Sequence, residues 1–440
     1  MPPTNNLHFA IVGGGITGLT LAIALHHRGL SVKLYEQAPS FREIGAGVAF
    51  TPNAVQAMQI CQSGVYQAFE TVRTRNMWAS KQKVWFDYYD GINATGDDAK
   101  SQAPAFTISN ELGNSGVHRA KFLDELVKLV PDGIAHFGKR LDIIDKLDDD
   151  LVSLTFTDGS TATANAILGC DGIKSRVRQI MFGEDHPCVH PTYTYKYAYR
   201  ALVPMDTAVA ALGEEKAQNS CMHMGPSGHM LTFPINHGQI MNVVAFTTTD
   251  KEWPDSQRLT LPAKREDALR DFERFGDNVK NVLKLADPDL DIWAIFDTGK
   301  HPMPAFNKGR ICLVGDAAHA SSPHHGAGAG MGIEDCAVLS ELLADETISN
   351  NHDVEAALAV FDSVRRQRGQ WLVQSSRHIG DCYEWLAKGV GDDFKKIESE
   401  INHRNGIIAN VNVREMCEDA RKQLKQRMSS ASTSGSSSSL

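Results

Sequence analysis

Paired cysteines, an excess of positive charge and long apolar runs are all missing from this sequence. None of its eight cysteines stands in a CxxC pair, and their spacing does not suit a small disulfide scaffold, so we expect reduced thiols in a cytoplasmic protein. Asp and Glu together outnumber Lys and Arg by 53 to 44, and the net charge of −9 argues against a general nucleic-acid surface.

Segments typical of export or membrane insertion are missing as well. Segment 9–25 is the one stretch similar to a signal peptide, but no Lys or Arg precedes it and glycines interrupt it. No other run approaches membrane-spanning length, so we expect no membrane partner. The Ser-rich tail 429–440 has little apolar surface to bury, and we expect it to be disordered. No repeat or pattern indicates an oligomeric state.

A strand, a glycine-rich turn and a helix follow one another near the start of the chain. The apolar run 7–12 leads into Gly13, Gly15 and Gly18, which form the pattern G-x-G-x-x-G ahead of a helical run. In a dinucleotide-binding turn the first glycine permits the tight bend, the second admits the pyrophosphate and the third lets helix and strand pack closely. The next apolar run ends at Glu36, whose carboxylate can accept the ribose hydroxyls. An acid there disfavours a 2′-phosphate, which leaves NAD or the adenosine half of FAD.

Three further segments distinguish between these nucleotides. Cys170-Asp171-Gly172-Ile173-Lys174-Ser175-Arg176-Val177-Arg178 follows a short apolar run, Gly315-Asp316 ends another, and Val117-His118-Arg119 opens a helical stretch. Together with the glycine turn they resemble the FAD-dependent aromatic hydroxylases, the single-component flavoprotein monooxygenases typified by para-hydroxybenzoate and salicylate hydroxylases. The resemblance extends over about residues 7–380.

This resemblance implies a set of cofactor-binding residues. Asp316 would bind the ribityl chain, Asp171 would serve both FAD and the reduced nicotinamide, and Arg119 would lie near the FAD phosphates. The backbone from Gly47 to Ala49, within the family-like loop and helix at 42–58, would lie close to the flavin. Bare backbone at Gly328 and Ala329 would meet the flavin ring, at the start of a helix whose positive end favours reduced flavin.

The same resemblance predicts the fold, which is α/β (α+β overall). We expect a Rossmann-type FAD-binding domain with an inserted, mostly antiparallel β-sheet substrate domain and a C-terminal helical segment. The expected ranges are 1–75, 100–188 and 295–375 for the first domain, 76–99 and 189–294 for the second, and 376–428 for the helices.

Segment 315–339 allows a second interpretation, because it contains three histidines and three acids as well as its glycines. His319, His324 and His325 could bind a metal, but no acid or thiol stands at a recognisable ligand spacing, so we expect no metal site. For Glu334 and Asp335 we expect a position in the first turn of a helix, where they complement its dipole.

Segment 192–204 should form a strand of the substrate domain. Alternation places Tyr193, Tyr195, Tyr197 and Tyr199 on one face and Lys196 and Arg200 on the other. Arg200 is our candidate for the residue that stabilises a substrate phenolate, since its guanidinium is permanently charged; a structural salt bridge is the alternative.

Several other residues are weaker candidates for the substrate site. His223, His229 and His324 could contact substrate, and the first two could assist its deprotonation. For His223 and His229 we favour the alternative, a structural place at a strand edge. Pro323 follows a family pattern in which a proline-bearing loop covers the reactive flavin face; otherwise it forms a simple turn.

The implied activity is hydroxylation of a phenolic ring through a flavin C4a-hydroperoxide, with FAD as cofactor and NADPH or NADH, O₂ and a small phenol as reactants. The segments at 44–53 and 321–330 resemble fungal enzymes that hydroxylate polyketide phenols, so a resorcylaldehyde-like substrate and possible dearomatisation are the first hypothesis. A decarboxylating salicylate-type hydroxylase, a flavin-binding scaffold without turnover and an NAD dehydrogenase are the alternatives.

Overall fold

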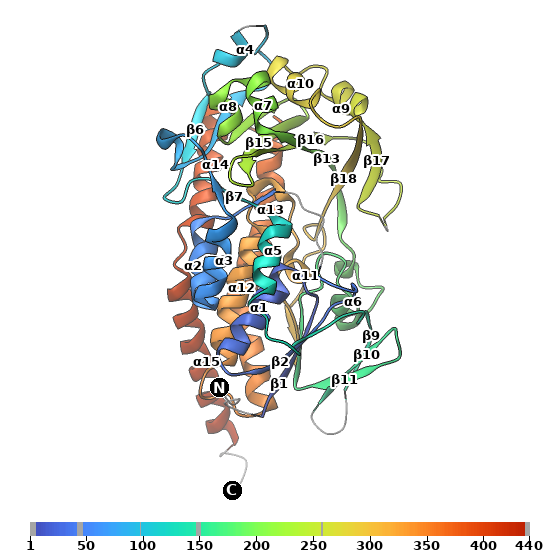
Figure 1. The fold of residues 1–440 in the computed structure, drawn as a ribbon. Helices are drawn as coiled ribbons and strands as arrows, with labels where there is room; N and C mark the ends of the chain where they lie inside the picture. Colours follow the sequence, from blue (N-terminus) through green and yellow to red (C-terminus); the bar gives the residue numbers. More distant parts are fainter. Residues whose placement is uncertain (1–5, 42–46, 97, 147–150, 257, 436–440) are drawn as a thin grey trace.

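The computed structural model describes residues 6–41, 47–96, 98–146, 151–256 and 258–435. Its lower half in Figure 1 is built on a six-stranded sheet of order β19-β20-β12-β1-β2-β8. These strands are β1 (His8–Val12), β2 (Ser31–Tyr35), β8 (Ala135–His136), β12 (Ala166–Gly169), β19 (Asn307–Lys308) and β20 (Ile311–Leu313). All neighbours pair in parallel except β19, and the central strands are apolar on both faces because both faces are covered.

Helices and a small sheet cover this central sheet. Helices α1, α2, α12 and α15 lie on one side in Figure 1, and the three-stranded sheet β11-β10-β9 lies on the other with α6. Their bounds are α1 (Ile16–His27), α2 (Pro52–Cys61), α3 (Ser63–Val72), α5 (Arg119–Val127), α6 (Arg176–Phe182), α11 (Asp316–His319), α12 (Gly328–Leu343), β9 (Leu141–Lys146), β10 (Val152–Phe156) and β11 (Thr161–Ala164). The expected Rossmann-type arrangement is confirmed.

The upper half holds an eight-stranded sheet of order β17-β18-β13-β16-β15-β14-β5-β6. Its neighbours are antiparallel except for β14 and β5. The strands are β5 (Val84–Asp90), β6 (Phe106–Ser109), β13 (Thr192–Pro204), β14 (Cys221–Gly225), β15 (Gly228–Ile235), β16 (Ile240–Thr248), β17 (Thr260–Lys264) and β18 (Asp289–Asp297). The antiparallel substrate-domain sheet is thus present, and β6 extends it beyond the expected boundary at residue 99.

The eight-stranded sheet has an outer and an inner face. Short helices cover the outer face: α4 (Asp98–Ser101), α7 (Met205–Leu212), α8 (Glu214–Gln218), α9 (Arg265–Asp271) and α10 (Asp277–Leu283). The inner face is turned toward the central sheet and the C-terminal helices. A small sheet joins the two halves, formed by β3 (Gly47–Ala49), β4 (Thr74–Arg75) and β7 (Ser115–His118).

Three helices complete the chain: α13 (Asn351–Tyr383), α14 (Phe394–Ala409) and α15 (Val413–Gly435). Helix α13 connects both halves, since Asn351 meets Asn165 near the central sheet and Tyr383 packs near Tyr88 of β5. The expectation of disorder from Ser429 is wrong as far as Gly435, because α15 continues through it. The hydroxyl of Ser429 donates to the carbonyl of Lys425, one turn back.

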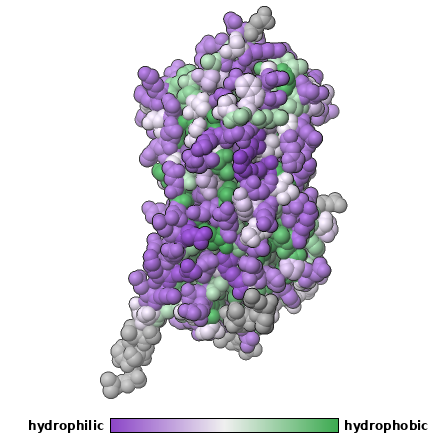
Figure 2. All heavy atoms as spheres, turned by 60° about the vertical axis from the view of Figure 1, so that its left-hand side comes forward, coloured by the Kyte–Doolittle hydropathy of each residue, from purple (hydrophilic) through white to green (hydrophobic). Residues whose placement is uncertain are grey.

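No helix in the described part of the chain is both long and apolar enough to span a bilayer. The face shown in Figure 2 is largely hydrophilic, with apolar residues in small separate areas.

Candidate active site

The turn after β1 packs its glycines against the end of β12. Gly13 has a φ of +103°, and a Cβ there would lie 2.5 Å from the carbonyl oxygen of Cys170. A Cβ on Gly18 would lie 1.9 Å from the carbonyl oxygen of Gly13, whereas one on Gly15 would meet open space. The first and third glycines therefore serve close backbone packing, and the second leaves room for a ligand at the start of α1.

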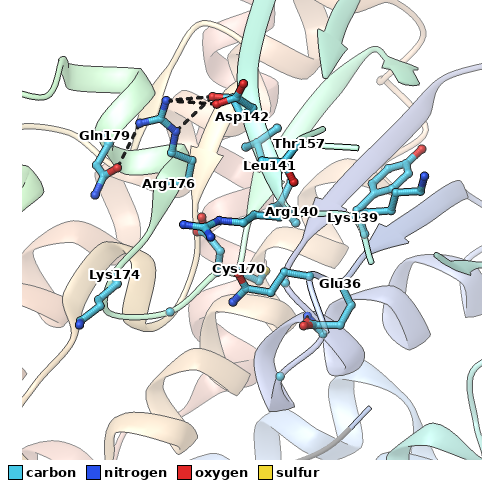
Figure 3. A pocket seen from close by; sticks show the side chains of 18 of the residues that line it. Glu36, Lys139, Arg140, Leu141, Asp142, Thr157, Cys170, Lys174, Arg176 and Gln179 are labelled. Atoms are coloured by element: carbon cyan, nitrogen blue, oxygen red, sulfur yellow. Dashed lines mark hydrogen bonds and ion pairs between the residues drawn. The ribbon is translucent and has the colours of Figure 1, made fainter. Parts of the chain in front are cut away.

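Glu36 stands just after β2 and holds this turn in place. Its carboxylate accepts hydrogen bonds from the backbone N–H groups of Gly14 and Ala38, both at 2.7 Å. The same side chain lines a cavity of about 870 Å³ that extends over Gly15. Figure 3 shows Arg140 and Lys174 around this cavity. Its volume suits a nucleotide-sized ligand.

Asp171 organises the segment that follows β12. Its carboxylate accepts from the Ser175 hydroxyl at 2.5 Å and from the Val177 N–H at 3.0 Å, so it stabilises the N-terminus of α6. Burial raises the pKa of Asp171 even though these hydrogen bonds oppose the shift. Asp171 and Gly172 line the cavity that contains Glu36. The structure thus brings together the two nucleotide-binding segments expected from the sequence.

Arg178 connects this segment to the one beginning at Gly315. The side chain is fully buried, and its guanidinium donates to the carbonyls of Ala317 at 2.8 Å and Val189 at 3.0 Å. Burial lowers the pKa of Arg178, while Asp171 and Asp316 act in the opposite direction. Arg178 stands within the motif at 170–178, but nothing in the local pattern distinguishes an arginine that will be buried, so its role could not be predicted from the sequence.

Asp316 lies where the central sheet ends, as expected. It is the first residue of α11, directly after the loop that follows β20, and its side chain is exposed among buried neighbours. A Cβ on Gly328 would lie 3.9 Å from an Asp316 carboxylate oxygen, so Asp316 faces the first turn of α12. Gly328 and Ala329 are half-buried there, and the N-cap residue, Ala327, offers no side-chain cap.

Glu334 and Asp335 are not in the first turn of α12, so that expectation is wrong. The helix already begins at Gly328, because its glycines adopt helical geometry, and both acids are completely buried. Arg365 of α13 donates to both carboxylates at 2.7 Å. Arg368 donates to Glu334 at 2.8 Å. The acids therefore belong to an ion-pair network between α12 and α13.

This network also fixes the loop that carries Asp316. Asp335 accepts from the N–H of Gly315 at 2.9 Å and lies 2.6 Å from Nε2 of His319. Burial alone would raise the pKa of Asp335, but His319 and Arg365 outweigh it and lower the pKa to about 2. His319 therefore pairs with Asp335 in this network.

Arg200 lies on the inner face of the eight-stranded sheet. Its guanidinium carbon is 4.5 Å from the ring centroid of Trp293, and Arg200 forms no hydrogen bond or ion pair with another described residue. Burial, with a smaller contribution from nearby Arg119, lowers its pKa to about 10, so the group stays charged at neutral pH. Arg200, Trp293 and Asn242 line an open cavity of about 740 Å³. Among the residues that the structure describes, this charged donor has no partner, so it is available to a ligand.

The tyrosines of β13 only partly follow the expected alternation. Tyr197 and Tyr199 point to the outer face, where both hydroxyls donate to Asp271 at 2.6 and 2.7 Å. A register shift between Tyr193 and Tyr197 interrupts the pairing with β18, and Tyr195 has a φ of +59°. The separation of Tyr197 and Tyr199 from Arg200 is confirmed, whereas the regular alternation expected along the whole segment is interrupted at Tyr195.

The three candidate substrate histidines separate into two groups. His223 stacks on Tyr89 on the outer face of the sheet, with ring centroids 5.2 Å apart, so it lies on the opposite face from Arg200. Alternation along β14 turns Met222 and Met224 inward instead. His229 and His324 both lie at the inner face, with ring centroids 5.3 Å apart.

His229, His324 and Glu384 form a buried group that could in principle hold a metal ion. A ring nitrogen of each histidine and a carboxylate oxygen of Glu384 lie within 4.8 Å of one another. Lys196 already places its ammonium on the same carboxylate, which disfavours a second cation there. The absence of a metal stays a prediction.

The loop that carries Pro323 lies between the two halves of the site. Pro323 is exposed, whereas His324 and His325, which complete the short 3₁₀ helix η3 (Pro323–His325), are buried. His325 is held by Asn405 and Ser375, at 3.2 and 2.9 Å.

Gly47 lies against the inner face of the sheet, beside Phe233 and Asn242. Its N–H donates to Asn242 at 3.2 Å, and a Cβ on Gly47 would lie 2.8 Å from the ring of Phe233. The beginning of the expected flavin loop, residues 42–46, lies outside the described residues.

These residues fit FAD. The N-cap residues of α1 and α12 are Gly15 and Ala327, which provide no side-chain cap, so the first N–H groups of both helices can meet a bound anion or ring. The cavity at Glu36 extends over the open space at Gly15 at the first of these helix ends, and the exposed Asp316 faces the second.

Comparisons with known proteins agree with this geometry. Residues 148–376 match the model of the FAD binding domain, and residues 11–52 match the NAD(P)-binding Rossmann-like domain. The chain is 46% identical over 431 residues to the FAD-dependent monooxygenase pigN of Monascus ruber, covering 95% of this chain and 98% of pigN. It is 43% identical over 440 residues to the FAD-dependent monooxygenase orf3 of Aspergillus niger, covering 97% and 98%.

A solved structure supports the same assignment. A salicylate hydroxylase substrate complex superposes with a TM-score of 0.83 at 33% identity, covering 94% of this chain and 98% of that one. The family uses FAD, and NAD(P)H is the electron donor typical of the class. The chain therefore belongs to the FAD-dependent monooxygenases of the salicylate hydroxylase-like family.

Proposed function

We propose that this monooxygenase hydroxylates a small phenol of the polyketide-derived, resorcylaldehyde-like class in fungal secondary metabolism. The observation that carries the proposal is the guanidinium of Arg200, which pairs with no residue in the described ranges and stacks on Trp293 beside the cavity at the inner face of the sheet. A ring hydroxyl that ionises in this cavity would place its negative charge next to a fixed positive one. The ionised ring is also more electron-rich, and hence a better target for electrophilic oxygen transfer.

The roles of the cofactor-binding residues are part of the proposal. Gly13, Gly15, Gly18 and Glu36 would hold the adenosine and pyrophosphate, Asp171 and Arg119 would flank them, and Asp316 would bind the ribityl chain. The ring would rest against Gly328 and Ala329, with Gly47, Ala49 and Pro323 around it. Bound FAD supplies hydride acceptance and O₂ activation in this class. The chain contributes position, phenolate stabilisation and exclusion of water.

A panel of phenols tests the substrate class. Purified, FAD-loaded protein is mixed with NADH or NADPH and with alkylated resorcylaldehydes or salicylates, and oxygen uptake and NAD(P)H oxidation are recorded. The expected result is strong stimulation by a resorcylaldehyde and a ring-hydroxylated or dearomatised product by mass spectrometry and NMR. Stimulation by none of the phenols would refute the proposed substrate class.

A decarboxylating salicylate-type hydroxylase is the second candidate. It is favoured by the overlap with the salicylate hydroxylase substrate complex along nearly the whole chain. The two candidates differ in one product, because attack at the carboxylated carbon releases CO₂. Release of CO₂ in step with NAD(P)H oxidation would replace the first candidate by the second.

A further inference from the structure

Asn242 forms part of the wall of the cavity that contains Arg200 and Trp293. It lies on β16, directly opposite Leu202 of β13 and Phe233 of β15. Residues opposite each other in antiparallel strands share a face, and Leu202 is two residues from Arg200, so Asn242 lies on the inner face as well. Only 1% of Asn242 is exposed. A polar amide is thus buried in the wall of the proposed substrate cavity.

One hydrogen bond determines how the amide of Asn242 is turned. Its Oδ1 accepts from the backbone N–H of Gly47 at 3.2 Å. A backbone N–H can only donate, so the amide oxygen must be the atom that faces Gly47, and the NH₂ group must point elsewhere. Nδ2 is buried and has no hydrogen-bond partner in the described chain. The side chain therefore has N–H donors that no described residue uses.

The NH₂ group of Asn242 needs an acceptor. A buried donor without a partner has lost its hydrogen bonds to water and gained none in return, and most buried polar side chains do have a partner. The side chains directly opposite, Leu202 and Phe233, are apolar and offer no acceptor. Because Asn242 lines a cavity, a bound molecule can supply the missing acceptor.

Asn242 and Arg200 are close enough to bind one small ring together. Arg200 is opposite Val244, and Asn242 is two residues from Val244 along β16. Such diagonal neighbours are roughly 7–8 Å apart on the surface of a sheet. A benzene ring that carries oxygen atoms on two sides can therefore contact both side chains, one charged and one neutral.

The hydrogen bond to Gly47 also relates Asn242 to the flavin. A Cβ on Gly47 would lie 3.0 Å from the amide carbon of Asn242, so the backbone and the amide are in close contact. In the proposed function the backbone at Gly47 lies beside the flavin ring. An acceptor bound by Nδ2 is then held at a fixed place relative to the flavin.

The charges around the cavity favour a neutral acceptor. Of the described residues that line it, four are aspartates and two, Arg200 and Lys264, are cations. Lys264 already pairs with Asp289. A second negative charge on the ligand, in addition to the phenolate, would therefore meet an excess of carboxylates. A carbonyl oxygen accepts a hydrogen bond without adding a charge, so it matches the amide of Asn242.

We propose that Asn242 determines substrate specificity by donating an N–H from Nδ2 to a carbonyl oxygen of the substrate, while Arg200 stabilises its phenolate. This inference rests on the proposed function and narrows its substrate class to phenols that carry an aldehyde or a ketone on the ring. The contact is a hydrogen bond, so no covalent bond forms or breaks in it. Because the ring is held at two points, the contact decides which ring carbon faces the flavin.

A pair of ligands of similar shape tests this role. An alkylated resorcylaldehyde is compared with its vinyl analogue, in which a CH₂ group replaces the carbonyl oxygen and removes the acceptor. The Kd of each ligand for the FAD-loaded, oxidised protein is measured from the change in flavin absorbance. Turnover of both is measured with NAD(P)H under air.

The variants separate the two hydrogen bonds of Asn242. Asn242→Asp keeps an oxygen that can accept from Gly47 but has no N–H to donate when ionised, whereas Asn242→Ala removes both groups. The matched control is Leu202→Ala, which shortens the side chain directly opposite without changing a polar group. FAD content and Tm are measured for every variant.

The wild type should bind the resorcylaldehyde about tenfold more tightly than the vinyl analogue, or better, because the analogue leaves the buried donor unpaired. In Asn242→Ala and Asn242→Asp the ratio of the two Kd values should fall to one or below, while Leu202→Ala should keep the wild-type ratio. A purely structural defect would weaken the binding of both ligands equally and leave the ratio unchanged.

Two different failures can be told apart. Equal Kd values for the two ligands in the wild type, with the resorcylaldehyde still hydroxylated, would overturn the role of Asn242 alone, and this comparison holds even where the Asn242 variants do not fold. A wild-type preference that both Asn242 variants retain would overturn that role too. A wild type that neither binds nor hydroxylates any phenol would overturn the proposed function together with this inference.

Discussion

At the scale of single residues, the glycines of the first turn have different roles, because one is needed for folding and another for ligand binding. A Cβ on Gly18 would collide with the backbone of Gly13, whereas one on Gly15 would meet open space. Gly18→Ala should therefore destabilise the FAD-free protein by about 1–3 kcal/mol or more, as overpacking does. Gly15→Ala should leave that stability nearly unchanged and weaken FAD binding.

Urea unfolding without FAD and a flavin fluorescence titration measure the two effects. Equal loss of stability in both variants would contradict these separate roles.

Arg200 gives a second prediction at this scale. Arg200→Lys keeps a positive charge but loses the planar guanidinium that stacks on Trp293 and can donate to a phenolate oxygen. Product formation should fall roughly a hundredfold, in line with loss of one preorganised donor, while FAD remains bound. Leu202→Ala, at the same cavity and inner face, is the matched control and should retain most activity.

Product yield per NAD(P)H consumed and the flavin spectrum check this prediction. Wild-type yield in Arg200→Lys would remove the residue from the reaction.

At the scale of elements, one buried arginine connects α13 to α12. Arg365 is completely buried and pairs with both Glu334 and Asp335. Arg365→Leu leaves two buried carboxylates with one fewer cation, so the free energy of unfolding should fall by about 3–5 kcal/mol. The neighbouring Arg366 pairs with Asp362 at the surface, so Arg366→Ala should lower the free energy of unfolding by less than about 1 kcal/mol.

Chemical denaturation of the two arginine variants, side by side, provides the measurement. A similar small loss for both would show that the buried network contributes little to stability.

Elements also show how far the sequence could predict this fold. The turn at Gly13 and the strand before Asp316 both depend on neighbours in the chain, and local patterns revealed them. Glu384 lies 155 residues from His229, and no spacing rule connects them. Packing between elements determines the bulge near Tyr195, so side-chain alternation did not predict the strand correctly there. It also determines the start of α12 at Gly328, so the helix-dipole argument misplaced the first turn of that helix.

At the scale of the whole molecule, buried carboxylates determine the response to acid. Interactions with His319 and Arg365 lower the pKa of Asp335 to about 2 against burial, and His229 and Lys196 do the same for Glu384. The pKa of each of these carboxyls is lower in the folded protein than in the unfolded chain, where it is near 4. Each ionised carboxylate therefore adds to the free energy of unfolding above pH 4, and this contribution is lost as the pH falls through the folded-state pKa.

Unfolding free energy should therefore fall between about pH 4 and pH 2, and Glu384→Gln should make that fall shallower. Urea midpoints across this range provide the measurement. An acid response in Glu384→Gln as steep as that of the wild type would contradict the assignment.

The central claim is that the cavity beside Arg200 holds a phenol while one oxygen atom is transferred to its ring. The most direct measurement is turnover of an alkylated resorcylaldehyde with NAD(P)H under O₂ labelled with heavy oxygen, followed by mass spectrometry of the product. The account predicts one labelled oxygen atom on the ring of the product, formed with FAD bound. NAD(P)H oxidation that yields only hydrogen peroxide, with the phenol unchanged, would contradict it.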